Sequence, residues 1–160
     1  MNDVLASPSV RRVQEALDAL GGDHRVIELT ASARTAADAA RAVGCRVDQI
    51  VKSLVFRGRH TGRAILVTAS GAHRVNEHRI AGLVAEPVEK GDADFVRART
   101  GFAIGGVAPV GHPEPLTTLI DEDLFAWGEI WAAAGHPNTV FRLAPTDLVR
   151  MTGGRVVGVE

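Results

Sequence analysis

A lone lysine inside an apolar segment is the first residue of this sequence that could do chemistry. Lys52 lies within the segment IVKSLVF at residues 50–56. An unpaired ammonium is costly to bury, so a lysine in such a segment must be paired or must face a cavity. Two interpretations follow from the spacing alone. Lys52 is either part of a structural ion pair or an anchor for an anionic or carbonyl group of a ligand.

A glycine-rich loop about fifty residues later is the second candidate. The segment GFAIGGVAPVG at residues 101–111 contains four glycines and Pro109. Glycine lets a ligand approach the main chain closely, and proline fixes the backbone. The spacing is not that of a dinucleotide fingerprint, and no Gly-Lys-Ser/Thr follows, so the segment is not a phosphate-binding P-loop. What remains is either an ordinary turn or an element from Gly105 to Pro109 that presents main-chain groups to a small substrate.

Histidines and the single cysteine give weaker signals. His136 lies in a turn between two expected strands, where it is either solvated or able to orient water or contact a ribose. Cys45 has no evident base nearby in the sequence and is interpreted as structural. We expect no metal, because the remaining histidines lack metal-ligand spacing; they are residues 24, 60, 73, 78 and 112.

Two further polar positions are interpreted structurally. Ser53 follows Lys52, but adjacent side chains of a strand point to opposite faces, so the two should not cooperate directly. Asp121 and Asp123 precede Leu124 and are most simply explained as capping residues at the start of a helix.

Strands and helices are expected to alternate around these candidates. Strand-like patterns occupy residues 25–29, 50–56, 63–68, 116–120, 129–133, 139–143 and 155–159. Helix-start signals stand at Ser7 with Pro8, Thr35, Asn76, Asp92 and Thr146. The pattern predicts an α+β (mixed α/β) fold, with a mixed, curled sheet and helices around it.

Composition limits the function classes. A chain of 160 residues is expected to form a single domain over residues 1–160, and its net charge of −1 means that a nucleic-acid partner must meet a local basic patch. No apolar run approaches the ~18 residues of a membrane span, so we expect no membrane partner. One cysteine excludes an internal disulfide and fits the cytoplasm. Five Phe and no Tyr argue against a base-stacking RNA-binding sheet.

Five segments in this order resemble the YbaK/ProX family of free-standing aminoacyl-tRNA deacylases, which are related to the editing insertion domain of bacterial prolyl-tRNA synthetase. They are TAADAA at residues 35–40 with Gly44, IVKSLVF at 50–56, GFAIGGVAPVG at 101–111, IDEDL at 120–124 and AGHPN at 134–138. Each segment is weak alone, and their order makes the match fairly specific. The resemblance implies a barrel-like mixed sheet with flanking helices, no cofactor, and hydrolysis of a mischarged amino acid from tRNA.

The resemblance also implies roles for individual residues. The catalytic lysine of the family falls on Lys52, and the Gly-x-x-x-Pro loop falls on Gly105 to Pro109, with main-chain groups of Gly105 and Gly106 near the reacting ester. Substrate-binding positions are then expected at Ser53, Gly101, Ile104, Val107, Pro109 and His136. The implied substrate is a small amino acid of the cysteine or alanine class on tRNA, with tRNA for proline favoured.

Other functions remain open from the sequence. The same fold could serve as a non-catalytic module that binds tRNA or a synthetase, or as a hydrolase of another small ester. Prolyl-tRNA synthetase is a candidate partner, and the oligomeric state is not specified by the sequence. Basic residues of the first hairpin and the following segment are either a tRNA-facing surface or a solvated face; they are Arg57, Arg59, His60, Arg63, Arg74, His78 and Arg79.

Overall fold

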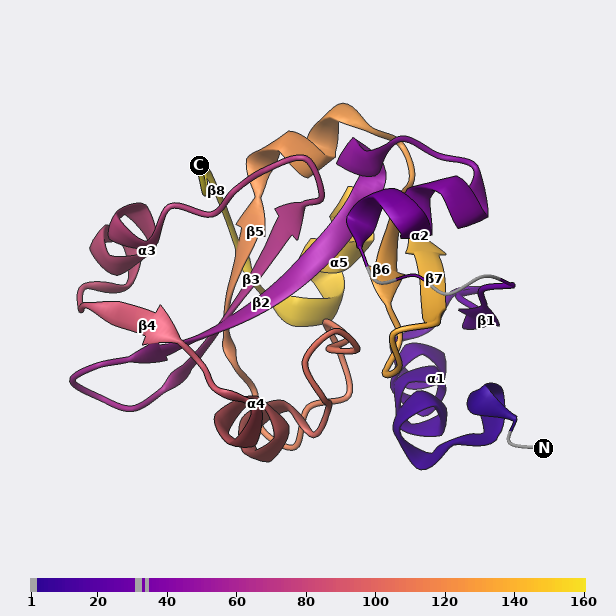
Figure 1. Ribbon diagram of the computed structural model, residues 1–160, viewed down its shortest axis with the longest axis horizontal. Coiled ribbons are helices and arrows are strands. Elements are labelled where there is room, and N and C mark those ends of the chain that lie inside the picture. The colour runs from indigo at the N-terminus through magenta and orange to yellow at the C-terminus, as the bar shows by residue number, and fades with distance from the viewer. Residues whose placement is uncertain (1–2, 31–32, 34) are drawn as a thin grey trace.

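The computed structural model describes residues 3–30, 33 and 35–160, and these fold as one mixed sheet with helices packed around it (Figure 1). The helices are α1 (Pro8–Leu20), α2 (Ala36–Val43), α3 (Glu77–Val84), α4 (Ala93–Thr100) and α5 (Pro145–Thr152), with short 3-10 turns at Val4–Ala6, Val47–Gln49 and Glu122–Ala126. The strands are β1 (Ile27–Glu28), β2 (Ile50–Gly58), β3 (Ala64–Ser70), β4 (Val88–Lys90), β5 (Thr117–Asp121), β6 (Ile130–Ala133), β7 (Thr139–Leu143) and β8 (Arg155–Val157).

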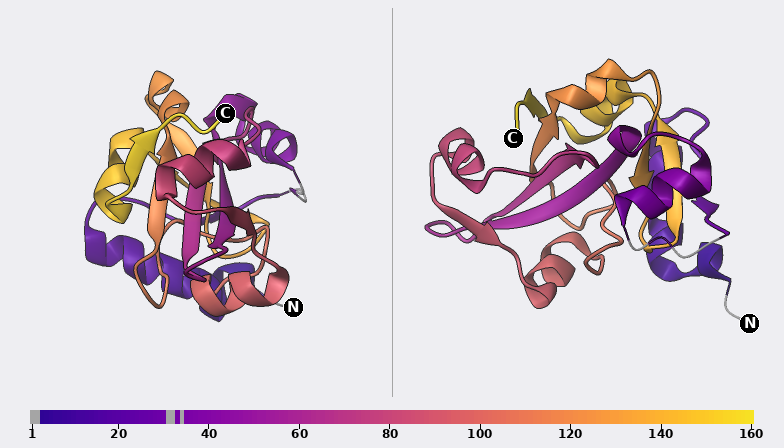
Figure 2. Two further views of the ribbon diagram at one scale, coloured as in Figure 1. Left: turned by 90° about the vertical axis from the view of Figure 1, so that its left-hand side faces the viewer. Right: turned by 45° about the horizontal axis from the view of Figure 1, so that its top comes forward.

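The sheet combines parallel and antiparallel pairs. Its order is β1-β7-β6-β2-β3-β5-β8, with β4 pairing β2 off this path. β2 and β3 form an antiparallel hairpin, whereas β6 runs parallel to β2, and β5 runs parallel to both β3 and β8. The sheet twists along its length (Figure 2) and ends at β1 and β8 without closing into a barrel. The predicted mixed α+β fold with a curled sheet and flanking helices is confirmed.

Strand alternation divides the core into two faces at β2. Val51 and Val55 pack into the cluster that receives α1, α4 and α5, whereas Leu54 and Phe56 pack into the cluster that receives α3. Lys52 lies in the same alternation as Leu54 and Phe56, as its position in the sequence predicted. A third cluster places α2 over the β2, β6 and β7 end of the sheet.

Local capping explains where the helices begin. Side chains of Thr35, Asn76 and Asp92 each accept a hydrogen bond from the main-chain N–H three residues on, as their positions predicted. Ser7 precedes Pro8 at the start of α1 but makes no side-chain capping bond. Among the described helices, none is long and apolar enough to cross a membrane.

Candidate functional site

A cleft with a volume of about 590 Å³ opens beside β2, at the end of the sheet covered by α2. Its walls come mainly from α2, the first half of β2, the loop after α4, and strands β6 and β7 with the turn between them. Most lining side chains are small and apolar, such as Ala36, Ala39 and Ala133. A cleft of this size with few polar groups is typical of a small-molecule site.

Lys52 supplies the cationic group of this cleft. Its ammonium donates a hydrogen bond to the main-chain carbonyl of His73. Partial burial lowers the pKa of Lys52 from its ordinary value, and the negative charge of Asp121 partly opposes that shift. An ammonium has three N–H donors. The bond to His73 orients the side chain and uses one donor, so the others remain for a ligand.

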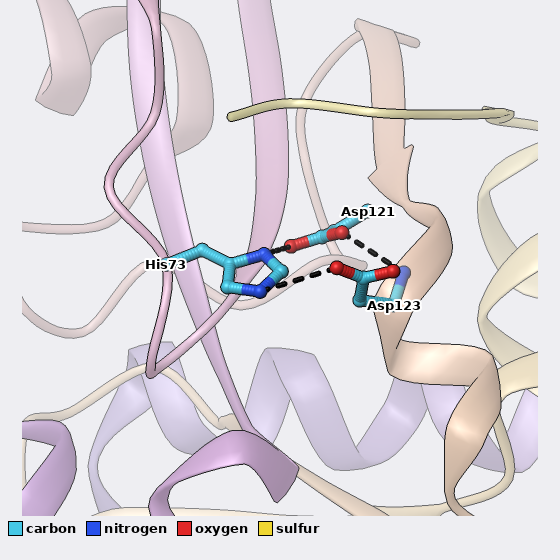
Figure 3. A group of neighbouring side chains, drawn as sticks. All are labelled: His73, Asp121 and Asp123. Atoms are coloured by element: carbon cyan, nitrogen blue, oxygen red, sulfur yellow. Dashed lines mark hydrogen bonds and ion pairs between the residues drawn. The ribbon is translucent and has the colours of Figure 1, made fainter.

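A network of hydrogen bonds centred on Asp121 joins it to His73 and Asp123 (Figure 3), and the His73 carbonyl accepts from Lys52. Asp121 ends β5 and is 1% exposed. One of its carboxylate oxygens accepts from the main-chain N–H of Ser70 at 3.0 Å and lies 2.8 Å from Nδ1 of His73. The other accepts from the N–H of Asp123 at 3.0 Å, which confirms the predicted capping role for Asp121. The network therefore ties the segment after β3 to the end of β5.

The same network brings together three potential metal ligands. Nε2 of His73 lies 3.2 Å from the carboxylate of Asp123. One ligand atom each from His73, Asp121 and Asp123 fall within 4.8 Å of one another. The spacing of histidines in the sequence did not indicate this group, because its carboxylates come from a distant strand end. Within it, Nδ1 and Nε2 of His73 each face a carboxylate, and Asp121 accepts two main-chain N–H groups, so hydrogen bonding accounts for the arrangement.

The loop at residues 101–111 reaches the cleft through its first half. Ile104, Gly105 and Val107 line the same cleft as Lys52. Gly105 has φ +91°, a conformation that side-chain-bearing residues rarely adopt. Ile104 is 59% exposed, so an apolar side chain stands at the mouth of the cleft. These three predicted positions share one wall.

The other predicted loop residues lie behind that wall. The N–H of Gly106 donates to the carbonyl of Ala103 at 3.0 Å, and a Cβ at Gly106 would lie 3.0 Å from the main chain of His136. Pro109 is buried, and the carbonyl of Gly101 accepts from Arg12 at 2.7 Å. None of Gly101, Gly106 and Pro109 is among the described residues that line the cleft. They shape the loop that presents Gly105.

Ser53 lines both the cleft and a smaller cavity of about 150 Å³ beyond the loop. Its side chain lies on the same face of β2 as Val51 and Val55, which is opposite to the face that carries Lys52. Its hydroxyl oxygen is buried and has no hydrogen-bond partner among the described residues. The two cavities share Ser53, Leu54, Ile104, Gly105 and Val107. They therefore form one groove across the middle of β2.

His136 and Cys45 stand apart from this groove. Nδ1 of His136 accepts from the N–H of Asn138 at 3.0 Å, and its neighbour Pro137, rather than His136, is among the described lining residues. Burial first, and the charge of Glu129 second, raise the pKa of the Cys45 thiol. A raised pKa disfavours the thiolate, which agrees with the structural interpretation of Cys45.

The hairpin arginines divide into structural and exposed residues. Arg63 donates to the carboxylate of Glu86 at 2.9 Å and to the main-chain carbonyl of Val84. Arg59 lies 3.6 Å from Glu89. Arg57 is exposed and stacks on Phe95 at 5.4 Å. Arg63 is therefore committed to the fold, while Arg57 remains on the surface.

The match to known proteins agrees with the fold. Residues 30–151 match the model of the aminoacyl-tRNA editing domain. A solved structure described as "a putative trans-editing enzyme for prolyl tRNA synthetase" is 49% identical, with a TM-score of 0.91 over 96% of this chain and 98% of that chain.

Two curated relatives extend the comparison. The "Putative Cys-tRNA(Pro)/Cys-tRNA(Cys) deacylase EbsC" of Enterococcus faecalis (strain ATCC 700802 / V583) is 26% identical over 76% of this chain and 74% of its own length. The proline–tRNA ligase of Elusimicrobium minutum (strain Pei191) is 33% identical over 53% of this chain, a match that spans 15% of the ligase. The chain belongs to the aminoacyl-tRNA editing domain family, which confirms the class of aminoacyl-tRNA hydrolase that its sequence predicted.

Proposed function

We propose that this protein removes a small, wrongly attached amino acid of the cysteine or alanine class from tRNA, with tRNA for proline as its preferred carrier. The observation that carries the proposal is that Lys52 and the main chain at Gly105 line the same largely apolar cleft. Among the described residues, the cleft thus offers one cationic side chain, main-chain dipoles and a few hydroxyl groups. The names of the relatives support the tRNA class, and prolyl-tRNA synthetase is the partner we propose in the cytoplasm.

The reaction needs no protein nucleophile. A water oxygen adds to the ester carbonyl carbon, the bond from that carbon to the ribose oxygen breaks, and the ribose oxygen takes up a proton. The products are the free amino acid and a tRNA with an intact terminal hydroxyl. An ester is already activated, so positioning the two reactants supplies much of the rate. In this proposal Lys52 holds the terminal phosphate or ribose, and the main chain at Gly105 orients the ester or the water.

The smaller cavity supports a small side chain. Val55, Phe56, Val96 and Val107 line its volume of about 150 Å³, next to Ser53. Apolar walls of this kind discriminate by excluding bulk more than by reading polar groups. We therefore place the amino-acid side chain in this cavity and the tRNA terminus in the larger cleft.

A panel of mischarged tRNAs tests the proposal. We expect release of a small amino acid from tRNA for proline at rates well above spontaneous hydrolysis, and little release of bulky ones. Lys52→Ala should lose most of the activity while its circular dichroism and melting curve stay close to those of the parent. If no member of the panel is cleaved, the protein is instead a module that binds tRNA or a synthetase.

Treatment with a chelator tests the expected absence of a metal. Dialysis against EDTA should leave deacylation unchanged, because the proposed chemistry uses an ammonium and main-chain groups. Loss of activity that zinc restores would contradict this and would assign a metal to His73, Asp121 and Asp123.

A further inference from the structure

The central strand β2 changes partners part-way along its length. On one edge it pairs continuously with β3, from Val51 to Arg57. On its other edge it pairs with β6 only at Ile50 and Val51, and with β4 only from Phe56 to Gly58. A gap of four residues, 52–55, therefore separates the two partners on that edge. Both cavities border this gap, since Ser53 and Leu54 line each of them.

The direction of the main chain in the gap follows from the neighbouring hydrogen bonds. The carbonyl of Ile50 accepts from Gly71 on the β3 side, whereas the carbonyl of Val55 accepts from Gly91 at 2.9 Å on the opposite side. Main-chain groups of a strand alternate between its two edges. Ser53 thus directs both its N–H and its C=O away from β3 and into the gap. The registers of β6 and β4 on β2 leave both groups without a strand partner among the described residues.

The lining of the groove restricts what can occupy this open edge. Lys52 and Lys90 are the charged side chains among the described lining residues, and none of these residues is acidic. An amino group entering the groove therefore meets no carboxylate among these residues, and the acceptors left for it are main-chain carbonyls and hydroxyl oxygens such as that of Ser53. Two residues that face each other in a hydrogen-bonded antiparallel pair exchange both of their N–H to C=O hydrogen bonds. The free N–H and C=O of Ser53 can therefore pair with one residue of an antiparallel strand.

We propose that the aminoacyl group of the substrate binds as a single strand residue paired with Ser53. Its α-amino group donates to the Ser53 carbonyl, and its ester carbonyl accepts from the Ser53 N–H. This inference rests on the proposed deacylase function and specifies how that function recognises its substrate. It makes the α-amino group a determinant of recognition and places the Ser53 N–H where it stabilises charge on the ester oxygen.

The pairing also fixes where the substrate side chain points. Paired residues of an antiparallel ladder carry their side chains on the same face of the sheet. An L-aminoacyl group would therefore direct its side chain to the Ser53 face, where Val55, Val96 and Val107 bound the smaller cavity. The buried, unpartnered hydroxyl of Ser53 lies on this face. A D-aminoacyl group in the same pairing would point its side chain to the opposite face, that of Lys52.

Nuclear magnetic resonance tests the pairing without turnover. The ¹⁵N-labelled protein is titrated with 3′-alanylamino-adenosine, in which an amide replaces the ester, and with 3′-propionylamino-adenosine, which lacks the α-amino group. We expect the amide signal of Ser53 to shift strongly with the first compound and the second to bind about 10- to 100-fold more weakly. Equal affinities, or an unmoved Ser53 amide at saturation, would overturn the inference.

Deacylation gives a second readout with a matched pair of variants. Ser53→Ala removes the hydroxyl and keeps the N–H, whereas Ser53→Pro removes both, at an edge position where proline breaks no bond to β3. We expect Ser53→Pro to deacylate about 10- to 100-fold more slowly than Ser53→Ala. Equal rates in two folded variants would contradict the role of the N–H. If the parent cleaves no mischarged tRNA, the proposed function fails, and the titration still decides the pairing by itself.

Discussion

Lys52 is the residue on which both the sequence and the structure converge. The sequence required a partner or a cavity for its ammonium, and the structure provides both, through the carbonyl of His73 and the cleft. One bond to a neutral carbonyl leaves the positive charge uncompensated locally, except by the nearby Asp121. The ammonium is thus oriented without being neutralised, which suits it to hold an anionic or polarised oxygen.

Substituting Lys52 should separate activity from stability. Lys52→Ala is expected to slow deacylation by roughly 10- to 100-fold or more, the usual loss for one charge-assisted hydrogen bond. Lys52→Arg should not restore the rate, because the planar guanidinium cannot replace a compact ammonium beside the His73 carbonyl. Single-turnover rates and melting curves on the same samples check this. A folded Lys52→Ala protein with full activity would remove Lys52 from the mechanism.

The two adjacent glycines should respond differently to a side chain. At Gly105 a Cβ meets only Pro137 at 3.8 Å, but φ is +91°, so Gly105→Ala costs about 1–2 kcal/mol of backbone strain and disturbs the cleft wall. At Gly106 a Cβ meets the main chain of His136 at 3.0 Å. Gly106→Val should therefore lower the melting temperature more than Gly105→Val. Gly105→Val should instead slow deacylation more for each degree by which it lowers the melting temperature. Melting curves and deacylation rates of both variants test this ranking. The opposite ranking would show that Gly105 belongs to an ordinary turn with no role in the site.

At the scale of elements, the position of the Lys52 acceptor depends on the contact between the ends of β3 and β5. The segment after β3 carries His73, and β5 ends at Asp121, whose carboxylate also caps the following 3-10 turn. Parallel pairing of β3 and β5 brings these ends together. The acceptor for Lys52 is therefore positioned by contacts between residues 48 apart in sequence.

Removing the Asp121 carboxylate should destabilise the protein. Asp121→Ala leaves the buried N–H of Ser70 unsatisfied, at a cost of about 1–3 kcal/mol. For a chain of this size that lowers the melting temperature by about 2–4 °C per kcal/mol. Asp123→Ala is the matched control, because that side chain is 60% exposed, and it should change stability by less than about 0.5 kcal/mol. Equal effects of the two substitutions would contradict the network.

The far end of the β2–β3 hairpin holds a buried carboxylate. Glu86 accepts from the N–H groups of His60 and Thr61, from the Thr61 hydroxyl and from Arg63. The main-chain N–H of Thr61 is the largest of the contributions that lower the pKa of Glu86 from 4.5 to about 2, against the opposing effect of burial. Gly58 makes room for it, since a Cβ there would overlap a carboxylate oxygen of Glu86.

The Glu86 pKa predicts an acid dependence of stability. A carboxyl whose pKa is lower in the folded than in the unfolded chain stabilises the fold above the unfolded value. That stabilisation is complete above about pH 4.5 and is lost as the pH falls toward about 2. Glu86→Gln should thus melt well below the parent at pH 7, and the difference should shrink on acidification to about pH 3. A difference independent of pH would show that the Glu86 charge does not stabilise the hairpin.

At the scale of the whole molecule, a nearly neutral protein must bind a polyanion through a local surface. Arg57 and Arg99 both stack on Phe95, at 5.4 and 5.2 Å, and Lys90 borders the smaller cavity. Arg63, which the sequence offered for the same surface, is held by Glu86 instead. The groove therefore opens beside a cluster of exposed cations on β2, β4 and α4.

This cluster predicts a salt-dependent affinity for tRNA. Replacing Arg57 and Arg99 by alanine should weaken binding and reduce the slope of log affinity against log salt by about 1 for each tRNA phosphate that is no longer neutralised. The effect should fall on the Michaelis constant and leave turnover nearly unchanged. Arg25→Ala with Arg155→Ala is the matched control, since Arg25 lies just before β1 and Arg155 lies in β8, and these two strands end the sheet away from the β2–β4 pair. Identical salt series for the two double variants would exclude this surface.

Local features of the sequence were sufficient for most elements and for the central residue. Capping residues such as Thr35, Asn76 and Asp92 marked helix starts, because a cap is a contact within three residues. The side-chain alternation around Lys52 is also a local signal. It placed Lys52 on the same face of β2 as Leu54, because a strand has a fixed two-residue period. Family resemblance added the function class and a role for the loop at Gly105, which its glycine content had already singled out.

Other features were decided by tertiary structure, because they depend on pairing between distant segments. The short strand β4 has three residues and no strong local pattern, yet its pairing with β2 defines one end of the gap at Ser53. The His73–Asp121 contact and the commitment of Arg63 to Glu86 are likewise long-range. The sequence by itself was sufficient to select Lys52 and the glycine-rich loop as candidates for the chemistry. Only the folded sheet decided which of their main-chain and side-chain groups are already satisfied and which are left to face a substrate.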